Sequence, residues 1–187
     1  LFRTRAELEQ QGYRLVGNRL VKDGSIYLPM YEGRLGFQFN HRYATQPSGK
    51  LQVVSLSQLQ EAYFLVEPQF FVDQNEFETR MGRLRLSCVT GLLGYRRIAR
   101  NTDERTVVAS IIPWGPASYG WILSLGPDAA GLSLLCATYN SLVFDYLLRQ
   151  SLSQPSIPQS TFEQVATLSP TAYTPADLAF IVPRVLE

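Results

Sequence analysis

The pattern of apolar and polar positions changes from strand-like to helix-like along the chain. Short runs rich in β-branched and aromatic residues, with Gly and Pro between them, predict strands. The predicted strands are residues 15–21, 25–31, 70–72, 83–90, 95–99, 107–112 and 121–125. From residue 128 to residue 150, apolar side chains recur at spacings of three and four. This spacing predicts one long helix whose broad apolar face packs on a sheet.

Shorter helices are predicted near both ends of the chain and between the strands. Residues 4–11 carry an N-terminal capping box, with Thr4 at the N-cap and Glu7 three positions later, and they stop at Gly12. Other helical segments are predicted at residues 57–62, 74–81 and, at the C-terminus, 176–187, and a short amphipathic turn is predicted at residues 162–168. We therefore expect an α+β fold with an irregular mixed or antiparallel sheet, one long covering helix and short peripheral helices.

The bulk composition is that of a globular domain. Hydrophobic residues make up 45% of the chain and charged residues 18%, which excludes a disordered chain. The length of 187 residues suits a single domain, and the net charge of +1 provides no overall basic field for nucleic acid. Because the chain begins at Leu1 and its helical pattern still runs at Glu187, we expect residues 1–187 to be one domain of a longer polypeptide.

Charged residues are unevenly distributed along the sequence. Residues 80–105 contain seven arginines against two acids, Asp103 and Glu104, whereas residues 61–78 contain five acids and no base. The chain has 15 Arg and only 2 Lys. This bias favours planar, forked recognition of phosphate or guanine, although a GC-rich genome produces it too.

Residues that usually carry catalysis or bind metals are scarce. Cys88 and Cys136 lie in apolar runs where buried thiols are common, so neither a disulfide framework nor a zinc site is indicated. His41 is the only histidine, which leaves no two-histidine metal site and no arguable catalytic triad. It is either a structural histidine or a contact to a base or phosphate. With no signal peptide and no apolar span of membrane length, we expect a cytoplasmic location and no membrane partner.

A polar block at residues 95–106 lies between two apolar runs, residues 87–93 and 107–112. Its polar members are Arg96, Arg97, Arg100, Asn101, Thr102, Asp103, Glu104, Arg105 and Thr106. Guanidinium groups suit phosphate oxygens and guanine edges, while the acids can orient the arginines, accept from a cytosine amine or cap a turn. The alternative is a solvated hairpin closed by its own Arg–carboxylate pairs.

Three segments resemble those of a family of large DNA-modification enzymes. Residues 28–45 (LPMYEGRLGFQFNHRYAT) resemble its LPLYEGKMIHQFDHRYAT stretch, residues 95–106 (YRRIARNTDERT) its FRDIARSTDERT, and residues 135–150 (LCATYNSLVFDYLLRQ) its LLANLNSFVFDYVARQ. The resemblance covers about residues 13–186, with the blocks in order. These blocks are similar to the C-terminal, TaqI-like target-recognition region of type IIG and related restriction–modification proteins.

The chain departs from that family pattern in several places. Asn40 stands where the family has the Asp of a DHR triplet, Arg97 stands where it has an Asp, and residues 154–157 replace a Gly-Gly-Thr-His segment. The Asn-Pro-Pro-Tyr motif of adenine methyltransferases and the cofactor-binding glycines do not occur in this sequence. The resemblance places them upstream, in another part of the polypeptide.

The resemblance implies a DNA target-recognition domain that confers sequence specificity on an adenine-N6 DNA methyltransferase or restriction enzyme. The implied partners are double-stranded DNA and the upstream methyltransferase domain of the same polypeptide. The parent protein then uses S-adenosylmethionine, while this fragment has no catalytic residue, no metal and no cofactor of its own. The implied DNA-binding residues are Arg96, Arg97, Arg100, Asn101, Thr102 and Arg105, with His41, Arg42 and Tyr43 as a second surface.

Two alternatives stay open. The polar block can instead be a fold signature of the family, in which case the residues that read DNA sequence lie in residues 46–82. The chain can also be a protein-interaction module that docks the methyltransferase core or a partner subunit. The apolar patch expected for such docking comprises Leu92, Leu93, Trp114, Tyr119 and Trp121.

Overall fold

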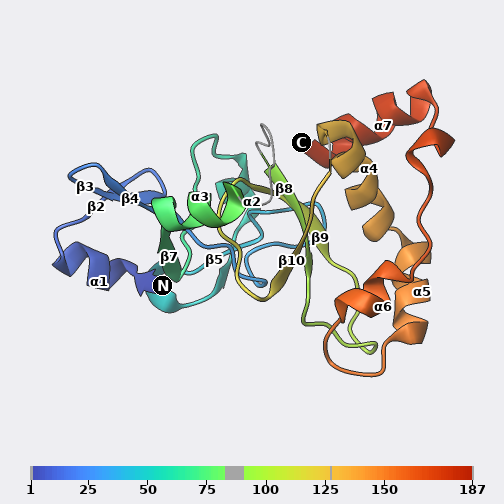
Figure 1. The fold of residues 1–187 in the computed structure, drawn as a ribbon, viewed down its shortest axis with the longest axis horizontal. Coiled ribbons are helices and arrows are strands. Elements are labelled where there is room, and N and C mark those ends of the chain that lie inside the picture. Colours follow the sequence, from blue (N-terminus) through green and yellow to red (C-terminus); the bar gives the residue numbers. More distant parts are fainter. Residues whose placement is uncertain (1, 83–90, 127, 187) are drawn as a thin grey trace.

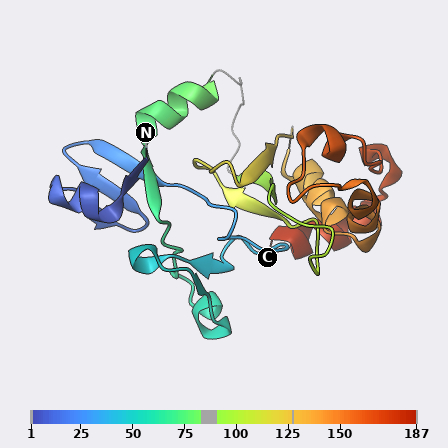
Figure 2. The same ribbon diagram turned by 90° about the horizontal axis from the view of Figure 1, so that it is seen from below.

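The computed structural model describes residues 2–82, 91–126 and 128–186. Within these residues the fold is α+β, as the sequence pattern predicts, with antiparallel sheets and a layer of helices at the C-terminal end (Figure 1). Figure 2, seen from below, shows the yellow-green three-stranded sheet between the blue N-terminal sheet and the orange C-terminal helices. The central polar block therefore extends from the sheet in the middle of the molecule.

The N-terminal part forms a five-stranded sheet of order β1-β7-β4-β3-β2. Its strands are β1 (Phe2–Thr4), β2 (Arg14–Val16), β3 (Arg19–Lys22), β4 (Ser25–Pro29) and β7 (Phe70–Asp73). β4 and β7 confirm the strands predicted at residues 25–31 and 70–72. The single strand predicted at residues 15–21 is wrong, because the chain turns at Gly17, whose φ of 63° lies in the left-handed region that favours glycine.

Short helices and a two-stranded sheet flank this unit. α1 (Arg5–Gln10) has the predicted capping box: the Thr4 hydroxyl accepts from the Glu7 backbone N–H, and the Glu7 carboxylate accepts from the Thr4 backbone N–H. The other elements are β5 (Ala44–Thr45), η1 (Pro47–Gly49), β6 (Gln52–Val53), α2 (Leu56–Gln60) and α3 (Gln74–Gly82). α2 and α3 confirm the helices predicted at residues 57–62 and 74–81.

The three-stranded sheet has the order β10-β8-β9. Its strands are β8 (Gly91–Arg96), β9 (Ala109–Pro113) and β10 (Trp121–Ser124). β9 and β10 match the strands predicted at residues 107–112 and 121–125. The strand predicted at residues 95–99 is wrong beyond Arg96, where β8 ends, and the strand predicted at residues 83–90 lies outside the described residues.

The C-terminal helices pack on the three-stranded sheet mainly through contacts of α4 with β8 and β9. They are α4 (Ala129–Tyr139), α5 (Leu142–Ser151), α6 (Gln159–Glu163), η2 (Pro170–Ala172) and α7 (Pro175–Leu186). The single helix predicted over residues 128–150 is wrong, because the chain bends by 63° between α4 and α5. At the bend the Asn140 side chain bonds the backbone of Ala109, and the Ser141 hydroxyl caps α5 by accepting from the Phe144 N–H at 3.2 Å.

The short amphipathic turn expected at residues 162–168 is also displaced, since the helical residues there are α6 at residues 159–163. α7 confirms the predicted C-terminal helix, with Glu187 outside the described residues. No single helix in the described parts of the chain is long and apolar enough to cross a membrane, although α4 and α5 with their bend together match a broken span in length and composition.

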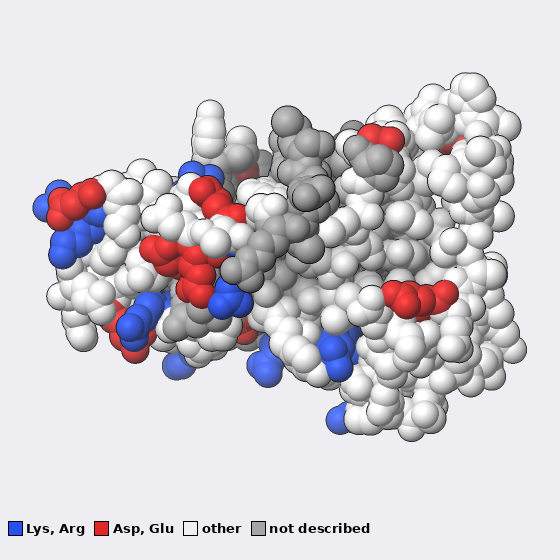
Figure 3. Space-filling view, viewed as in Figure 1, with Lys and Arg blue, Asp and Glu red and all other residues white. Residues whose placement is uncertain are grey.

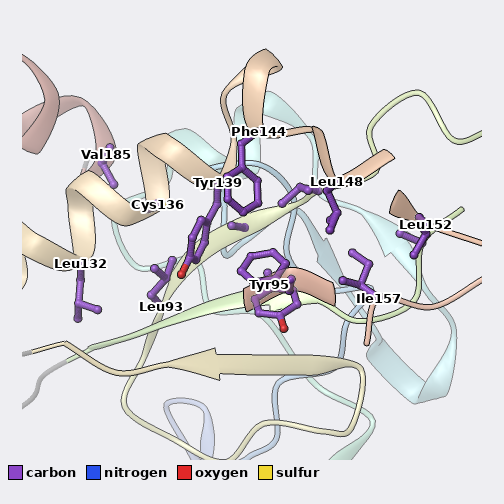
Figure 4. Packing of buried hydrophobic residues seen from close by; sticks show 14 residues of the cluster. Leu93, Tyr95, Leu132, Cys136, Tyr139, Phe144, Leu148, Leu152, Ile157 and Val185 are labelled. Carbon is purple, nitrogen blue, oxygen red and sulfur yellow. The ribbon is translucent and has the colours of Figure 1, made fainter. Parts of the chain in front are cut away.

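The largest core cluster lies between the three-stranded sheet and the C-terminal helices (Figure 4). Tyr95, near the end of β8, stacks on Phe162 of α6 with 3.7 Å between ring centroids and 3° between ring planes. Tyr139 and Phe144 pack against Phe162 with centroid distances of 4.8 and 5.2 Å. These contacts fix the end of β8, and hence the position from which the polar block leaves the sheet.

Candidate nucleic-acid interface

The polar block forms a loop that joins β8 to β9 and is called the central loop (residues 97–108). Five consecutive residues are exposed and are called the loop tip: Arg100, Asn101, Thr102, Asp103 and Glu104. On its C-terminal side the loop enters the core at Thr106 and Val107, both fully buried. The loop is therefore anchored at its ends and open to solvent at its tip.

The first two arginines of the block contact other parts of the protein. Arg96 Nη2 donates to the carbonyl of Gly36, and its guanidinium lies 5.4 Å from the ring centroid of Phe37. Burial lowers the pKa of Arg96 below its usual value. The Arg97 guanidinium lies 4.1 Å from the ring centroid of Tyr119. Both side chains thus tie the base of the loop to neighbouring segments.

The fourth arginine of the block, Arg105, is held beside a buried carboxylate. Its side chain is only 16% exposed, its Nε lies 3.6 Å from Asp145 Oδ1, and its Nη2 donates to the carbonyl of Asn140. The same Asp145 Oδ1 accepts from the backbone N–H groups of Thr106 and Val107, each at 2.8 Å. A carboxylate from α5 therefore satisfies two backbone donors where the loop returns to the sheet.

A second residue of α5, Arg149, forms hydrogen bonds with the backbone of the loop tip. Arg149 Nη2 donates to Asp145 Oδ2 at 3.0 Å, and the same side chain donates to the backbone carbonyls of Asn101 at 2.9 Å and Glu104 at 3.1 Å. Sequence reasoning placed these two residues in a family-like block but did not pair them with the central loop. The sequence signal for this pairing is the spacing of Asp145 and Arg149, because residues four positions apart lie on the same face of a helix.

Within the tip, backbone geometry is fixed by one of the acids. The Asp103 carboxylate accepts from the Arg100 N–H at 2.8 Å, and the Thr106 hydroxyl donates to the Arg100 carbonyl at 3.3 Å. Asp103 therefore caps a turn, one of the roles expected from the sequence. Among the described residues the Arg100 guanidinium has no hydrogen-bond partner and no ion pair, so it is available to a ligand.

The second predicted surface, His41, Arg42 and Tyr43, lies on the segment after Gly36. Arg42 Nη2 donates to the carbonyl of Leu59 at 3.2 Å, and Tyr43 stacks on Phe37 with 4.9 Å between centroids. His41 is partly buried; burial, and next the charge of Arg42, lower its pKa.

Asn40 shows what one departure from the family pattern does in this structure. Its Oδ1 accepts from the Arg42 backbone N–H at 2.8 Å. An aspartate carboxylate at this position can accept the same bond, so the substitution keeps the turn and removes a negative charge.

The two predicted surfaces are connected along β9, the edge strand. The Gln38 amide can be oriented so that both its oxygen and its nitrogen have suitable partners. In this orientation Oε1 accepts hydrogen bonds from Arg105 Nε at 3.0 Å and from Arg105 Nη2 at 2.8 Å. The next residue, Phe39, donates its backbone N–H to the carbonyl of Ala109 in β9 at 3.0 Å. The segment from Gln38 to Arg42 therefore follows the outer edge of the sheet, away from the central loop.

Close packing around Trp121 holds the start of this segment. Trp121 Nε1 donates to the carbonyl of Glu32 at 2.7 Å. A Cβ atom placed on Gly36 would lie 2.6 Å from the Trp121 ring, and one on Gly94 would lie 2.8 Å from it. Only glycine fits at these two positions without moving the indole. Gly36 and Gly94 are thus both needed for packing against Trp121.

The apolar docking patch expected from the sequence is wrong, because most of its members are in the core. Leu92 and Leu93 are fully buried and Trp121 is 3% exposed. Tyr119 is exposed but lies against Arg97. A different apolar surface exists on α5, where four side chains are exposed: Leu142, Val143, Tyr146 and Leu147.

Acidic and basic side chains are mixed at the left end of the face seen in Figure 3 and unevenly spread over the rest of it. Acidic side chains gather over α3 in the left-hand part, while Lys and Arg side chains are spaced along the lower edge, beneath the sheets. In α3 an acid and a base form an exposed pair, Glu76 with Arg80 at 2.8 Å. The acidic region is part of residues 46–82, and its charge opposes a nucleic-acid contact there.

Comparisons with protein-family models, with curated proteins and with solved structures found no match to this chain. Within residues 2–82, 91–126 and 128–186, no group of three or more His, Cys, Asp or Glu side chains is placed to hold a metal ion.

Proposed function

We propose that the chain is a DNA-binding target-recognition domain that gives sequence specificity to an adenine-N6 DNA methyltransferase or restriction enzyme. The catalytic domain, its S-adenosylmethionine and any nuclease belong to another part of the polypeptide in this proposal. This chain then binds and orients double-stranded DNA, so that a separate active site can extrude and modify the target adenine. The proposal includes a cytoplasmic location.

The observation that carries the proposal is the loop tip, which is exposed yet held by a buried framework. Arg100 is free of internal partners among the described residues, while Arg149 fixes the carbonyls of Asn101 and Glu104. An arginine can donate two bonds to guanine O6 and N7, and an asparagine can pair with adenine N6 and N7. A rigid backbone behind such groups reduces the entropy cost of placing them against base edges.

The arrangement separates the predicted DNA contacts into two groups. Arg100, Asn101 and Thr102 are exposed and suited to touch DNA directly; Asn101 Nδ2 also donates a hydrogen bond to the Leu152 carbonyl at 3.5 Å, which leaves its Oδ1 and one N–H for a ligand. The remaining arginines of the block contact protein and are suited to hold the loop: Arg96, Arg97 and Arg105. The fold-signature alternative and the recognition hypothesis therefore apply to different residues of the same block.

Selection from a pool of short duplexes with a randomised central segment tests the proposal. The full chain, immobilised and washed at moderate salt, is expected to enrich duplexes that share a common sequence. A parallel selection with Arg100→Ala is expected to lose or change that sequence, while Arg19→Ala, an exposed arginine on β3, keeps it. Recovery of duplexes without any shared sequence would contradict the proposal.

One observation favours a second candidate function, a protein-interaction module. Leu142 and Val143 are 74% and 70% exposed on one side of α5, next to Tyr146 and Leu147. Contiguous exposed apolar side chains of this kind mark protein interfaces. Sedimentation velocity distinguishes the two functions: self-association that Val143→Asp abolishes, together with no enrichment of any duplex sequence, supports the module and not DNA recognition.

A further inference from the structure

A cavity with a volume of about 580 Å³ lies at the end of β9 opposite the central loop. Its walls come from three parts of the chain: residues 39–42, the end of β9 at Ile111–Pro113, and the C-terminal end of α7. Figure 1 shows the end of α7 beside β8 at the top of the sheet, while the loop between β8 and β9 lies at the bottom. The cavity therefore brings the second predicted surface together with α7, a contact that sequence reasoning did not include.

The charged side chains on the described walls are both arginines. Arg42 and Arg184 line the cavity, and no Asp or Glu of residues 2–82, 91–126 or 128–186 does. Asn40 and His41 add neutral polar groups; because burial lowers the pKa of His41, its imidazole can donate one N–H without carrying charge at neutral pH. Most of the other lining side chains are apolar, Ile111 among them. Two arginines among apolar side chains suit a ligand with an anionic group and an uncharged body.

Each arginine is held by one backbone carbonyl and keeps most of its donors. Arg42 Nη2 donates to the Leu59 carbonyl at 3.2 Å, and Arg184 Nη1 donates to the Phe180 carbonyl at 2.8 Å. The Arg184 guanidinium also lies 3.8 Å from the Phe180 ring centroid. A guanidinium has about five N–H donors, so a single bond to a carbonyl orients it and leaves other donors for an anion.

We propose that this cavity is a phosphate-binding site that holds a phosphodiester of the nucleic-acid backbone, with Arg42 and Arg184 as its two cationic groups. The inference rests on the proposed function and extends it: the loop tip reads bases, and this site positions the duplex. β8 has six residues, so the sheet spans roughly 20 Å at about 3.3 Å per residue. One turn of duplex is about 34 Å long, so both sites can contact the same DNA molecule.

The first test is the salt dependence of duplex binding by Arg184→Ala. Arg80→Ala is the matched control, because Arg80 also lies in the last turn of a helix, is exposed and bonds the residue four positions before it. Loss of one phosphate contact is expected to reduce the slope of log K against log salt by about 0.9. The preference for a selected duplex over its scrambled form should stay unchanged. A slope equal to that of Arg80→Ala would overturn the inference and leave the proposed function intact.

The second test uses inorganic phosphate and does not depend on duplex binding. Titration of the ¹⁵N-labelled chain is expected to shift the Arg184 Nε–Hε resonance and the His41 ring resonances, and to leave those of Arg19 in place. If phosphate shifts these resonances but the chain binds no duplex, the phosphate site stands and DNA recognition is rejected. Shifts together with an unchanged salt slope in Arg184→Ala would mean that the site takes free phosphate, which overturns the backbone assignment. Absence of both effects would reject the site.

Discussion

Asp145 and Thr106 are 39 positions apart in the sequence, yet the Asp145 carboxylate accepts the Thr106 backbone N–H at 2.8 Å inside the protein. The same oxygen accepts from Val107, and the second oxygen pairs with Arg149. A helix thereby controls the geometry of a loop whose tip is exposed. This link between α5 and the central loop is the structural basis of the proposed recognition surface.

Replacing Asp145 is expected to destabilise the chain strongly. Asp145→Ala leaves the N–H groups of Thr106 and Val107 and the guanidinium of Arg105 without their buried partner, which costs about 3–5 kcal/mol of unfolding free energy. Asp145→Asn keeps an acceptor oxygen and should lose less. Urea unfolding followed by circular dichroism measures both. Equal stability of Asp145→Ala and the unmodified chain would show that the carboxylate does not hold the loop.

The stacked pair Tyr95 and Phe162 gives a prediction for the core. Phe162 is 5% exposed and contacts three aromatic rings, so Phe162→Ala removes a large buried side chain and should cost about 3–5 kcal/mol. Leu168→Ala is the control, because Leu168 is 62% exposed and its truncation should change stability little. Thermal unfolding of the two variants checks this order; similar melting temperatures would contradict the packing in Figure 4.

Glycine at position 94 is expected to be required by the indole of Trp121. A Cβ at Gly94 would lie 2.8 Å from the ring, so Gly94→Ala should cost about 1–3 kcal/mol through overpacking. Gly115→Ala is matched to it, because the nearest heavy atom to a Cβ there is 3.7 Å away. Urea midpoints compare the variants, and tryptophan fluorescence reports displacement of the ring. If Gly94→Ala is as stable as Gly115→Ala, the Trp121 indole does not pack against position 94.

Much of the architecture follows from local sequence patterns. The capping box at Thr4 and Glu7 predicts α1, and alternating or β-branched runs predict β4, β7, β9 and β10. The break between α4 and α5 does not follow from apolar periodicity, because apolar residues recur at helical spacing on both sides of Asn140. The break depends on bonds from the Asn140 side chain to Ala109, 31 positions away in the sequence.

In the candidate site, too, the local sequence identifies the residues, but contacts with distant residues determine their roles. Sequence composition identifies four arginines in one block as equivalent candidates. Arg105 and Arg100 differ only in the structure, where Arg105 lies beside Asp145 and Arg100 points to solvent. Partners that come from 35 or more positions away decide which arginine is structural, and no local pattern contains them.

Ionisation of Cys136 should lower stability at alkaline pH. Cys136 is fully buried, and burial raises the pKa of its thiol from 9.0 to about 12. A thiol in the unfolded chain therefore ionises first as pH rises above 9, so the unfolding free energy falls between pH 9 and about 12 and is fully retained below that window. Burial raises the pKa of Tyr95 to about 12 as well, which acts in the same direction above pH 10.

Alkylation measures the protection of this thiol directly. In a Cys88→Ser background, Cys136 is the only cysteine, and mass spectrometry can follow its reaction with iodoacetamide. The folded chain should react far more slowly than the same chain in urea, at a rate that follows unfolding. Reaction of the folded chain at the rate of the unfolded one would contradict burial of the thiol.

The central claim is that the loop tip distinguishes one DNA sequence from another, and the discrimination ratio of Arg100→Ala tests it most directly. Fluorescence anisotropy gives Kd for the selected duplex and for its scrambled form at one fixed salt concentration. A bidentate contact to guanine predicts that Arg100→Ala weakens binding to the selected duplex by about 1–3 kcal/mol and binding to the scrambled duplex much less. Arg19→Ala should leave the ratio unchanged. An unchanged ratio in Arg100→Ala, with a lowered melting temperature, would contradict the claim and leave the central loop as scaffold.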